Sequence, residues 1–259
     1  MRKLTFIAML AAILGACTAK VADKAPESVP VHDVFDRTGT MVRHDTLRPV
    51  IWLIFSADST FEGGPAALDA LDERGLKANF FFTGNFLRDS VNSPIIHRVV
   101  DGGHYVSGHS NGHILYADWS DRKVLVDPDS TLKDMRANMA ELRRYGVNTD
   151  SVTWLVPPYE WIAEEQVKTL ADSMGIIAIN PTPGIQTFRD YTTPQDKAYR
   201  DSEWLLNQLY EVEREHTLNG AFLIIHLGTD SARHDKFHRY LPSIIDSLTT
   251  LGYSFERLP

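Results

Sequence analysis

Short apolar runs alternate with amphipathic stretches along most of the chain, from about residue 50 to the C-terminus. A short continuous apolar run is typical of a strand covered on both faces, whereas apolar residues three and four positions apart are typical of a helix. Glycines follow several of the amphipathic stretches and mark where those helices end. The pattern predicts strands at 50–55, 78–82, 105–107, 152–156, 176–180, 221–226 and 253–257, and helices at 65–74, 93–102, 130–145, 163–174, 202–215 and 235–251.

This alternation of strands and helices predicts a parallel sheet built of βα units in a single α/β domain over residues 50–259. Seven strands are awkward for an open sheet in a domain of this size, so the pattern favours an incomplete or distorted (β/α)7 barrel. In such folds the chemistry gathers where the parallel strands end. The polar residues at the predicted strand ends are Asp58, His109, His113, Glu160 and His226.

The N-terminal residues have a different pattern. Arg2 and Lys3 precede an apolar run at 4–13, which is too short to span a bilayer as a mature helix and is typical of a signal peptide. The following Leu-Gly-Ala-Cys sequence resembles a bacterial lipobox, so we expect residues 1–16 to be removed and Cys17 to carry a lipid anchor. An ordinary signal peptide with a chance cysteine is the alternative. Residues 17–49 are polar and predicted to be a tether, in which 39–48 could form an edge strand.

Composition and charge narrow the function further. The chain is 43% hydrophobic and 23% charged, which is ordinary for a globular protein. Its formal net charge of −8 and the lack of a basic run argue against a nucleic-acid partner. Cys17 is the single cysteine, so the chain has no internal disulfide and no cysteine for metal binding or nucleophilic catalysis.

His109 and His113 form the most informative cluster. Two histidines four positions apart meet on one side of a helical turn, from which both imidazoles can reach one cation. Such a spacing also arises by coincidence on solvated turns. Here it follows a predicted strand, and Asp58 follows an upstream strand, so the three side chains could meet at one end of the sheet.

At these residues the chain resembles the polysaccharide deacetylase family, also described as NodB-homology or chitin-deacetylase-like esterases. The His109-Ser110-x-x-His113 segment resembles the family's second motif, His-Ser/Thr-x-x-His. The segment 156–160 (Val-Pro-Pro-Tyr-Glu) approximates the third, Arg-x-Pro-Tyr/Phe-Gly, and 224–226 (Ile-Ile-His) is similar to the fifth, Leu-x-His. The resemblance extends over residues 50–259 and implies an incomplete (β/α)7 barrel.

The resemblance also implies a site. Asp58, His109 and His113 would hold one divalent metal ion, of which zinc suits one carboxylate and two imidazoles. His226 would protonate the leaving group, a role suited to its near-neutral pKa. A main-chain N–H near Tyr159 would face the oxyanion. Tyr159 and Trp161 could bind substrate by stacking on sugar rings, although aromatic residues also often belong to the core.

The chain departs from the family pattern where a proton must be moved. Ala57 occupies the position of the family's catalytic base, and Val156 that of the arginine that steadies the base. The aspartate of the fourth motif has no evident counterpart. Glu62 is the predicted replacement base, because it lies four residues after Asp58; Glu160 is the rival. Glu62 could instead cap the helix that begins near residue 65.

Two functions follow from the sequence. The first is a metal-dependent deacetylase that removes N- or O-acetyl groups from a glycan in the bacterial cell envelope, anchored by lipid on the periplasmic or outer surface. The second is a lipoprotein of the same fold that keeps the metal and binds carbohydrate but has lost turnover, as the missing base would permit.

Overall fold

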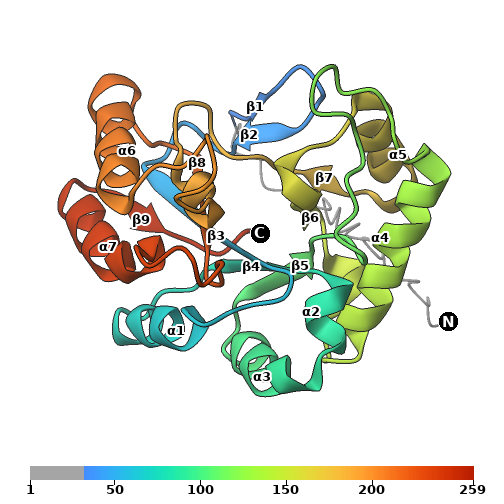
Figure 1. Ribbon diagram of the computed structural model, residues 1–259, viewed down its shortest axis with the longest axis horizontal. Helices are drawn as coiled ribbons and strands as arrows, with labels where there is room; N and C mark the ends of the chain where they lie inside the picture. The colour runs from blue at the N-terminus through green and yellow to red at the C-terminus, as the bar shows by residue number, and fades with distance from the viewer. Residues whose placement is uncertain (1–31) are drawn as a thin grey trace, which may run out of the picture. The chain divides into compact units, whose positions relative to one another are not determined.

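The fold is organised around β3 (Val50–Ala57), the longest strand of the computed structural model, which describes residues 32–259 (Figure 1). β3 pairs in parallel with β8 (Ala221–His226) on one side and with β4 (Asn79–Phe82) on the other. β4 pairs in turn with β5 (Tyr105–Gly108). Every residue of β3 is buried, which explains its almost continuous apolar sequence. The predicted signal peptide and Cys17 lie outside the described residues.

Two further strands continue the curve of the sheet. β6 (Trp154–Leu155) and β7 (Ile177–Ala178) form a parallel pair of their own. Beside β6, the Val156 N–H donates to the Gly108 carbonyl at the end of β5, at 3.4 Å. Beside β7, the Asn180 N–H donates to the carbonyl of Met41 at 2.9 Å. These contacts join the two sheets into a distorted barrel, so the predicted fold is confirmed.

The strand that completes the barrel is β2 (Met41–Arg43), which comes from the N-terminal part of the described chain. β2 pairs antiparallel with β8 and with β1 (Val34–Phe35), and Met41 also forms a parallel bridge with Ile179. Both strands lie in the segment for which we expected a tether and an edge strand. The compact unit therefore begins before residue 50 and includes both β1 and β2.

The last predicted strand has a different place from the others. β9 (Ser254–Phe255) pairs with Val50 and Ile51 at the start of β3, so it lies at the end of the barrel opposite the residues that follow β3. The seven helices of the described chain surround the strands (Figure 1). None of them is both long and apolar enough to cross a membrane. They are α1 (Gly64–Glu73), α2 (Gly84–Arg88), α3 (Ser93–Asp101), α4 (Pro128–Arg143), α5 (Glu164–Met174), α6 (Ser202–His216) and α7 (Leu241–Thr250).

The core has two layers because alternate residues of a strand point to opposite faces. Trp52 and Ile54 of β3 belong to a cluster made almost entirely by strand residues, which fills the barrel interior. Ile51, Leu53 and Phe55 belong to the larger cluster, which contains the apolar faces of the helices. Burial on both faces holds the strand ends in place, so that the loops after them can carry the site.

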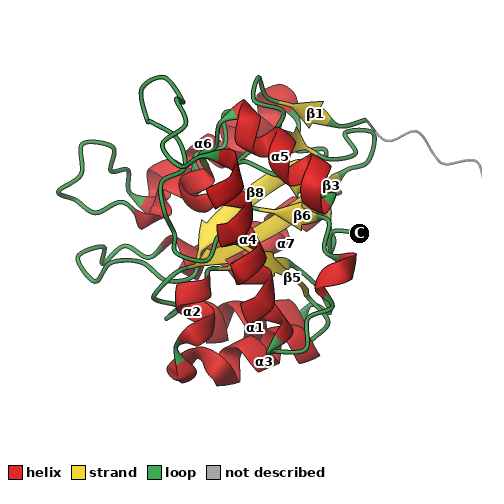
Figure 2. Cartoon of the chain, turned by 90° about the vertical axis from the view of Figure 1, so that its right-hand side faces the viewer, coloured by secondary structure: helices red, strands yellow, loops and turns green. Residues whose placement is uncertain are grey.

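The long loops extend from one end of the molecule, opposite β1 and the C-terminus (Figure 2). Asp58 and Leu227 directly follow β3 and β8 at that end, and His109 directly follows β5. The parallel strands thus bring residues from distant parts of the sequence to one face, as expected for a barrel of βα units.

Candidate metal and proton-transfer site

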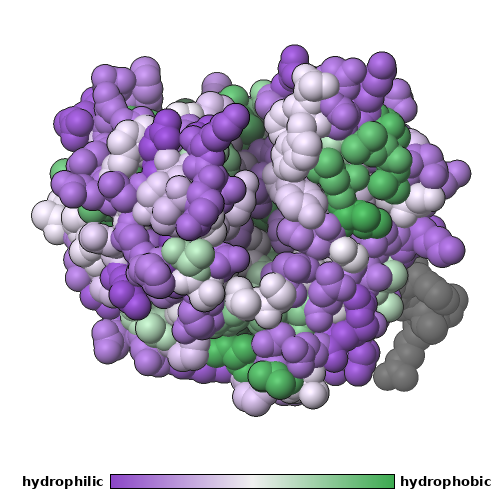
Figure 3. Space-filling model, viewed as in Figure 1, coloured by the Kyte–Doolittle hydropathy of each residue, from purple (hydrophilic) through white to green (hydrophobic). Residues whose placement is uncertain are grey.

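A pocket of about 370 Å³ lies where the strands end, with a deeper lobe of about 80 Å³. The loop-bearing face is hollowed at its centre (Figure 3). The structure brings together here five of the residues singled out from the sequence. Asp58, His109, His113, Glu160 and His226 all line the larger pocket.

The two histidines of the paired motif are held in different ways. His109 is buried, and its Nδ1 lies 2.9 Å from the Val156 carbonyl oxygen. Because a carbonyl only accepts, Nδ1 carries the proton and Nε2 keeps its lone pair. The His113 ring centre is 5.1 Å from that of His109, and its other neighbour is Tyr159, stacked at 4.3 Å.

Burial lowers the pKa of both imidazoles. The pKa of His109 falls well below its usual value because of burial and the nearby His113. The pKa of His113 is also lowered by burial, although the charge of Asp58 opposes this. Both rings are therefore neutral near pH 7, which is the form that binds metal.

Asp58 is oriented by two neighbours. Thr83 Oγ1 and Asn85 Nδ2 donate to its Oδ1, at 3.0 and 3.1 Å. Thr83 is also the N-cap of α2 and accepts from the Phe86 N–H. The start of α2 thus positions the carboxylate, and both bonds reach the same oxygen.

The turn that carries His113 depends on a residue from α4. The carboxylate of Asp134 accepts from the N–H groups of Asn111 and Gly112, at 2.8 and 3.2 Å, and from the Tyr116 hydroxyl at 2.7 Å. His113 has a left-handed φ of 50°, which is uncommon for a residue other than glycine. Asp134 therefore holds a strained turn in the conformation that directs His113 into the pocket.

His226 has a partner that the sequence analysis did not find. Its Nδ1 lies 2.7 Å from Asp190 Oδ1, and its main-chain N–H donates to Asp190 Oδ2 at 2.9 Å. Burial alone would lower the pKa of His226, but the charge and hydrogen bond of Asp190, together with Glu160, raise it. Asp190 lies in a short 3-10 turn at Thr187–Tyr191, inside an irregular segment without a periodic pattern. Asp230, another acid that lines the pocket, instead accepts from the Ala232 N–H.

Glu160 is the least satisfied acid of the pocket. It is 9% exposed, and its Oε1 is buried without a hydrogen-bond partner. Burial raises its pKa to about 7; Asp190 adds to this effect and His226 opposes it. Glu160 and Tyr159 have φ values of 52° and 60°, so Glu160 keeps the left-handed backbone for which the family motif has glycine. A strained, unpaired acid with a near-neutral pKa is typical of a functional group.

Glu62, the predicted base, is engaged elsewhere. Its Oε1 lies 2.9 Å from Lys236 Nζ and accepts from the Thr229 N–H at 3.1 Å. Burial would raise the pKa of Glu62, but these partners lower it overall. It does not line the pocket, and a carboxylate paired with a lysine is a weaker proton acceptor. This placement argues against Glu62 as the base and favours its rival, Glu160.

The two predicted substrate-binding aromatics have different surroundings. Tyr159 is 40% exposed and lies at the mouth of the pocket, against His113. Trp161 does not line the pocket; it lies in a neighbouring groove, where its Nε1 donates to the Asp118 carbonyl at 3.0 Å.

The three expected ligands line one pocket, but their side chains do not converge on a common point. Within residues 32–259, no group of three His, Cys, Asp or Glu side chains has the arrangement of a metal site. The donor chemistry nevertheless fits a divalent cation, because one carboxylate stands with two neutral imidazoles and the His109 tautomer leaves Nε2 free. Asp58, His109 and His113 therefore remain the predicted ligands.

Comparison with known proteins identifies the family. The family model described as polysaccharide deacetylase matches residues 43–178, which is more than half of the chain. The chain therefore belongs to the polysaccharide deacetylase family. An uncharacterised protein from Geobacillus stearothermophilus is 24% identical over 243 residues, covering 88% of this chain and 76% of that protein.

Solved structures share the fold at low sequence identity. A family 4 carbohydrate esterase from Bacillus subtilis superimposes with a TM-score of 0.64 at 21% identity, over 85% of this chain and 83% of that one. A pseudoenzyme of the same esterase family from Bacillus anthracis has a TM-score of 0.65 at 20% identity, over 85% and 67%. A family 4 acetyl xylan esterase from Clostridium thermocellum, solved with a cobalt ion, has a TM-score of 0.61 at 22% identity, over 80% and 87%.

Proposed function

We propose that the protein is a metal-dependent carbohydrate deacetylase that hydrolyses N- or O-acetyl groups on a glycan. The observation that supports this most is that Asp58, His109, His113, Glu160 and His226 all line one pocket. A divalent cation such as Zn²⁺, held by the first three, would polarise the acetyl carbonyl and acidify a water molecule.

The protein's own groups would carry the proton. Glu160 accepts the proton of the attacking water, since its pKa of about 7 makes it both ionisable and basic near neutral pH. The main-chain N–H of Tyr159 donates to the oxyanion. His226, kept protonated by Asp190, then donates to the departing nitrogen or oxygen, and acetate is released.

Acetate release tests the proposal. We expect the protein with added Zn²⁺ or Co²⁺ to release acetate from N-acetylglucosamine oligomers, acetylated xylan or peptidoglycan fragments. Glu160→Gln should reduce kcat/KM by at least about a hundredfold with unchanged metal content, because a general base contributes roughly 10²–10⁴ in rate. Full activity in this variant would remove Glu160 from the mechanism.

A second candidate, a metal-containing carbohydrate-binding lipoprotein without turnover, is favoured by Ala57. This residue lines the deeper lobe beside Asp58 and leaves the family's base position without an acid. Glycan binding without acetate release from any of these substrates would support this candidate instead.

The location in the bacterial cell envelope is also a proposal, supported by the sequence around Cys17. Cys17→Ser should move the protein from the detergent phase to the aqueous phase in Triton X-114 partition, because the only thiol available for acylation is gone. Equal partition of the two proteins would contradict a lipid anchor.

A further inference from the structure

The start of α2 joins the two chain segments that carry the predicted metal ligands. The Thr83 N–H donates to the carbonyl of Ala57, directly before Asp58, at 3.0 Å. The next residue, Gly84, donates its main-chain N–H to the Ser110 carbonyl at 3.0 Å, in the turn of the paired histidines. Two successive N–H groups are thus shared between the two segments. These bonds place the main chain of each segment, and other groups must orient the side chains.

Arg88, in the last turn of α2, joins the same segments through side chains. Its Nη2 donates to Asn85 Oδ1 at 2.8 Å, and Asn85 Nδ2 donates to Asp58 Oδ1 at 3.1 Å. Its Nη1 donates to Asn111 Oδ1 at 2.6 Å, and its Nη2 also reaches the Asn111 carbonyl, at 3.3 Å. The donors of a guanidinium point in fixed directions because the group is planar. One arginine therefore holds both asparagines at a set separation.

Arg88 also determines which end of the Asn85 amide faces Asp58. A guanidinium only donates hydrogen bonds, and a carboxylate only accepts them. With Arg88 at its oxygen, Asn85 directs its nitrogen toward Asp58. Without Arg88, the amide would be free to turn over and place its oxygen against the carboxylate, where it cannot donate. Arg88 thus acts on a predicted ligand through Asn85.

The glycine at position 84 makes room for this arrangement. A Cβ atom on Gly84 would lie 2.1 Å from Asn111 Oδ1 and 2.6 Å from Arg88 Nη1. Both distances are far shorter than a van der Waals contact, so a larger residue would displace the guanidinium or the turn. Gly84 is not among the glycines with a positive φ. The need for glycine here therefore comes from the close approach of the two segments.

The charge of Arg88 opposes metal binding, whereas its hydrogen bonds support it. A fixed positive charge beside a metal site disfavours a bound cation, because like charges repel. Glu141 offsets part of this charge, with its Oε1 3.8 Å from Arg88 Nη1. Loss of the arginine should therefore strengthen metal binding if its charge matters most, and weaken metal binding if its hydrogen bonds matter most. The sign of the change separates the two roles.

We propose that Arg88 is a positioning residue for the metal centre, which holds Asp58 and the turn of His113 at a fixed separation through Asn85 and Asn111. This inference rests on the proposed function, because that function places a metal ion at the two ligand-bearing segments. The hydrogen bonds of Arg88 outweigh its charge, so the arginine favours metal binding overall.

Zinc affinity tests this role without any turnover. Competition with a chelating dye gives the affinity of each purified protein. We expect Arg88→Met to bind zinc about tenfold or more weakly than the wild type, which is the usual loss when a group that orients a ligand is removed. Arg88→Lys should also bind more weakly, because lysine keeps the charge but loses the two-armed geometry. Unchanged or tighter zinc binding in Arg88→Met would overturn the proposal.

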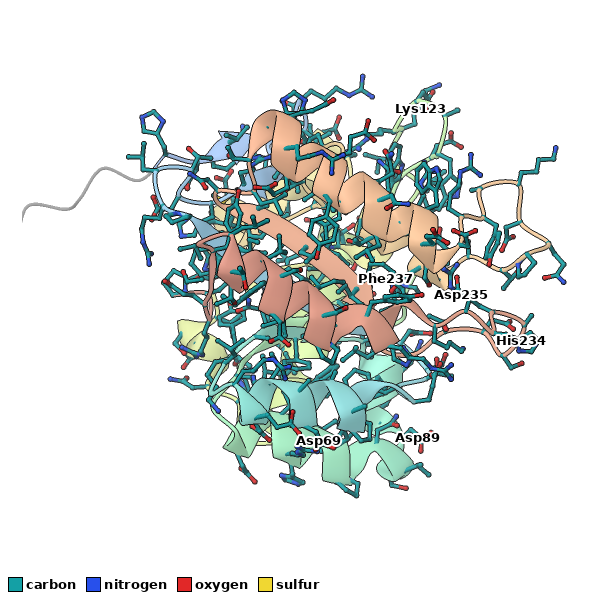
Figure 4. The ribbon with its side chains drawn as sticks, turned by 90° about the vertical axis from the view of Figure 1, so that its left-hand side faces the viewer. Asp69, Asp89, Lys123, His234, Asp235 and Phe237 are labelled. Atoms are coloured by element: carbon teal, nitrogen blue, oxygen red, sulfur yellow. The ribbon has the colours of Figure 1, made fainter. Side chains whose placement is uncertain are left out.

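Arg98→Met is the matched control. The side chains of Arg88 and Arg98 are 40% and 36% exposed, and Arg98 pairs with Asp69 and Asp72. Asp69 lies farther from the loop-bearing end than Asp89, which directly follows Arg88 (Figure 4). Both substitutions remove exposed ion pairs, so the melting temperatures of the metal-free proteins should fall by similar small amounts. Only Arg88→Met should lose zinc affinity, and an equal loss in both variants would overturn the proposal.

The failure of each proposal has its own signature. Zinc binding that depends on Arg88, without acetate release from any substrate, would refute the deacetylase and retain the positioning role. Acetate release together with wild-type zinc affinity in Arg88→Met would retain the deacetylase and refute the positioning role. A wild-type protein that binds no zinc or cobalt would refute both.

Discussion

The predicted metal ligands, which we call the metal side of the comparison, are Asp58, His109 and His113. They match the family motifs, and each is oriented by a hydrogen bond or a stacked ring. The positions that the family uses for proton transfer differ, and we call them the altered side of the comparison: the base position is Ala57, the arginine position is Val156, and the glycine position is Glu160. The metal side thus keeps the residues of the family motifs. The altered side contains Glu160, whose Oε1 is buried without a hydrogen-bond partner. If the proposed function is right, mutations on the metal side should change metal binding, and mutations on the altered side should change proton transfer.

Loss of a ligand should have the largest effect. His109→Ala or His113→Ala should remove most of the bound zinc, because each takes away one of three protein ligands. Asp58→Asn should cost less, since the amide retains an oxygen but loses the charge. Elemental analysis of the purified proteins measures this, and full zinc occupancy in His113→Ala would refute the metal assignment.

The second-largest effect should follow from a change at Asp134 of α4, which supports the turn that carries His113. Asp134→Asn should weaken zinc binding by about tenfold or more, because one carboxylate now holds two main-chain N–H groups and the Tyr116 hydroxyl. Zinc affinity is measured by competition with a chelating dye. Asp129→Asn, an exposed change in the first turn of the same helix, is the control and should leave the affinity unchanged.

On the altered side, Glu160 should make the stability of the protein depend on pH. Burial raises the pKa of Glu160 from 4.5 to about 7, so the folded state binds this proton more tightly than the unfolded state. The resulting stabilisation is complete below pH 4.5 and is lost as the pH rises through about 7, by up to roughly 3 kcal/mol. Gln mimics the protonated acid.

Metal-free Glu160→Gln should therefore gain thermal stability relative to the wild type between pH 5 and pH 8. The melting temperatures of the two proteins across this range give the measurement. A constant difference between them would show that Glu160 does not titrate there.

Glu62→Gln should have the smallest effect. Its side chain is 42% exposed and pairs with Lys236, so the change should cost only about 0.2–1 kcal/mol of stability. We expect kcat/KM to stay within about threefold of the wild type. A hundredfold loss with intact metal would return the base to Glu62 and contradict the contrast between the two sides.

The sequence was informative where local patterns decide the structure. Continuous apolar runs are sufficient to predict β3 and β8, and the glycine at 75 marks the end of α1 closely. β2 was harder to predict because it has only three residues and depends on pairing with Ala221 near the other end of the chain. A short strand of this kind is stabilised by its neighbours and has almost no pattern of its own.

For the candidate site too, the sequence revealed the residues in local motifs and missed those that depend on distant partners. The paired histidines lie in one local motif, so the sequence reveals them directly. Asp190 has no such signal, because its role depends on His226, which is brought next to it only by the fold. Glu62 looked suitable from its spacing after Asp58, but Lys236, distant in the sequence, engages it. Long-range ion pairs of this kind determine which acids are free, and no local pattern records them.

The placement of β2 also affects how the molecule can assemble. Segments from β3 to β5 are neighbours in both sequence and space, so they can associate while the rest of the chain is still being synthesised. β2 and the outer edge of β3 must wait for β8, which comes almost at the end. During that interval their backbone groups are open to pairing with other molecules. A chain that stops before β8 should therefore aggregate rather than form a smaller folded domain.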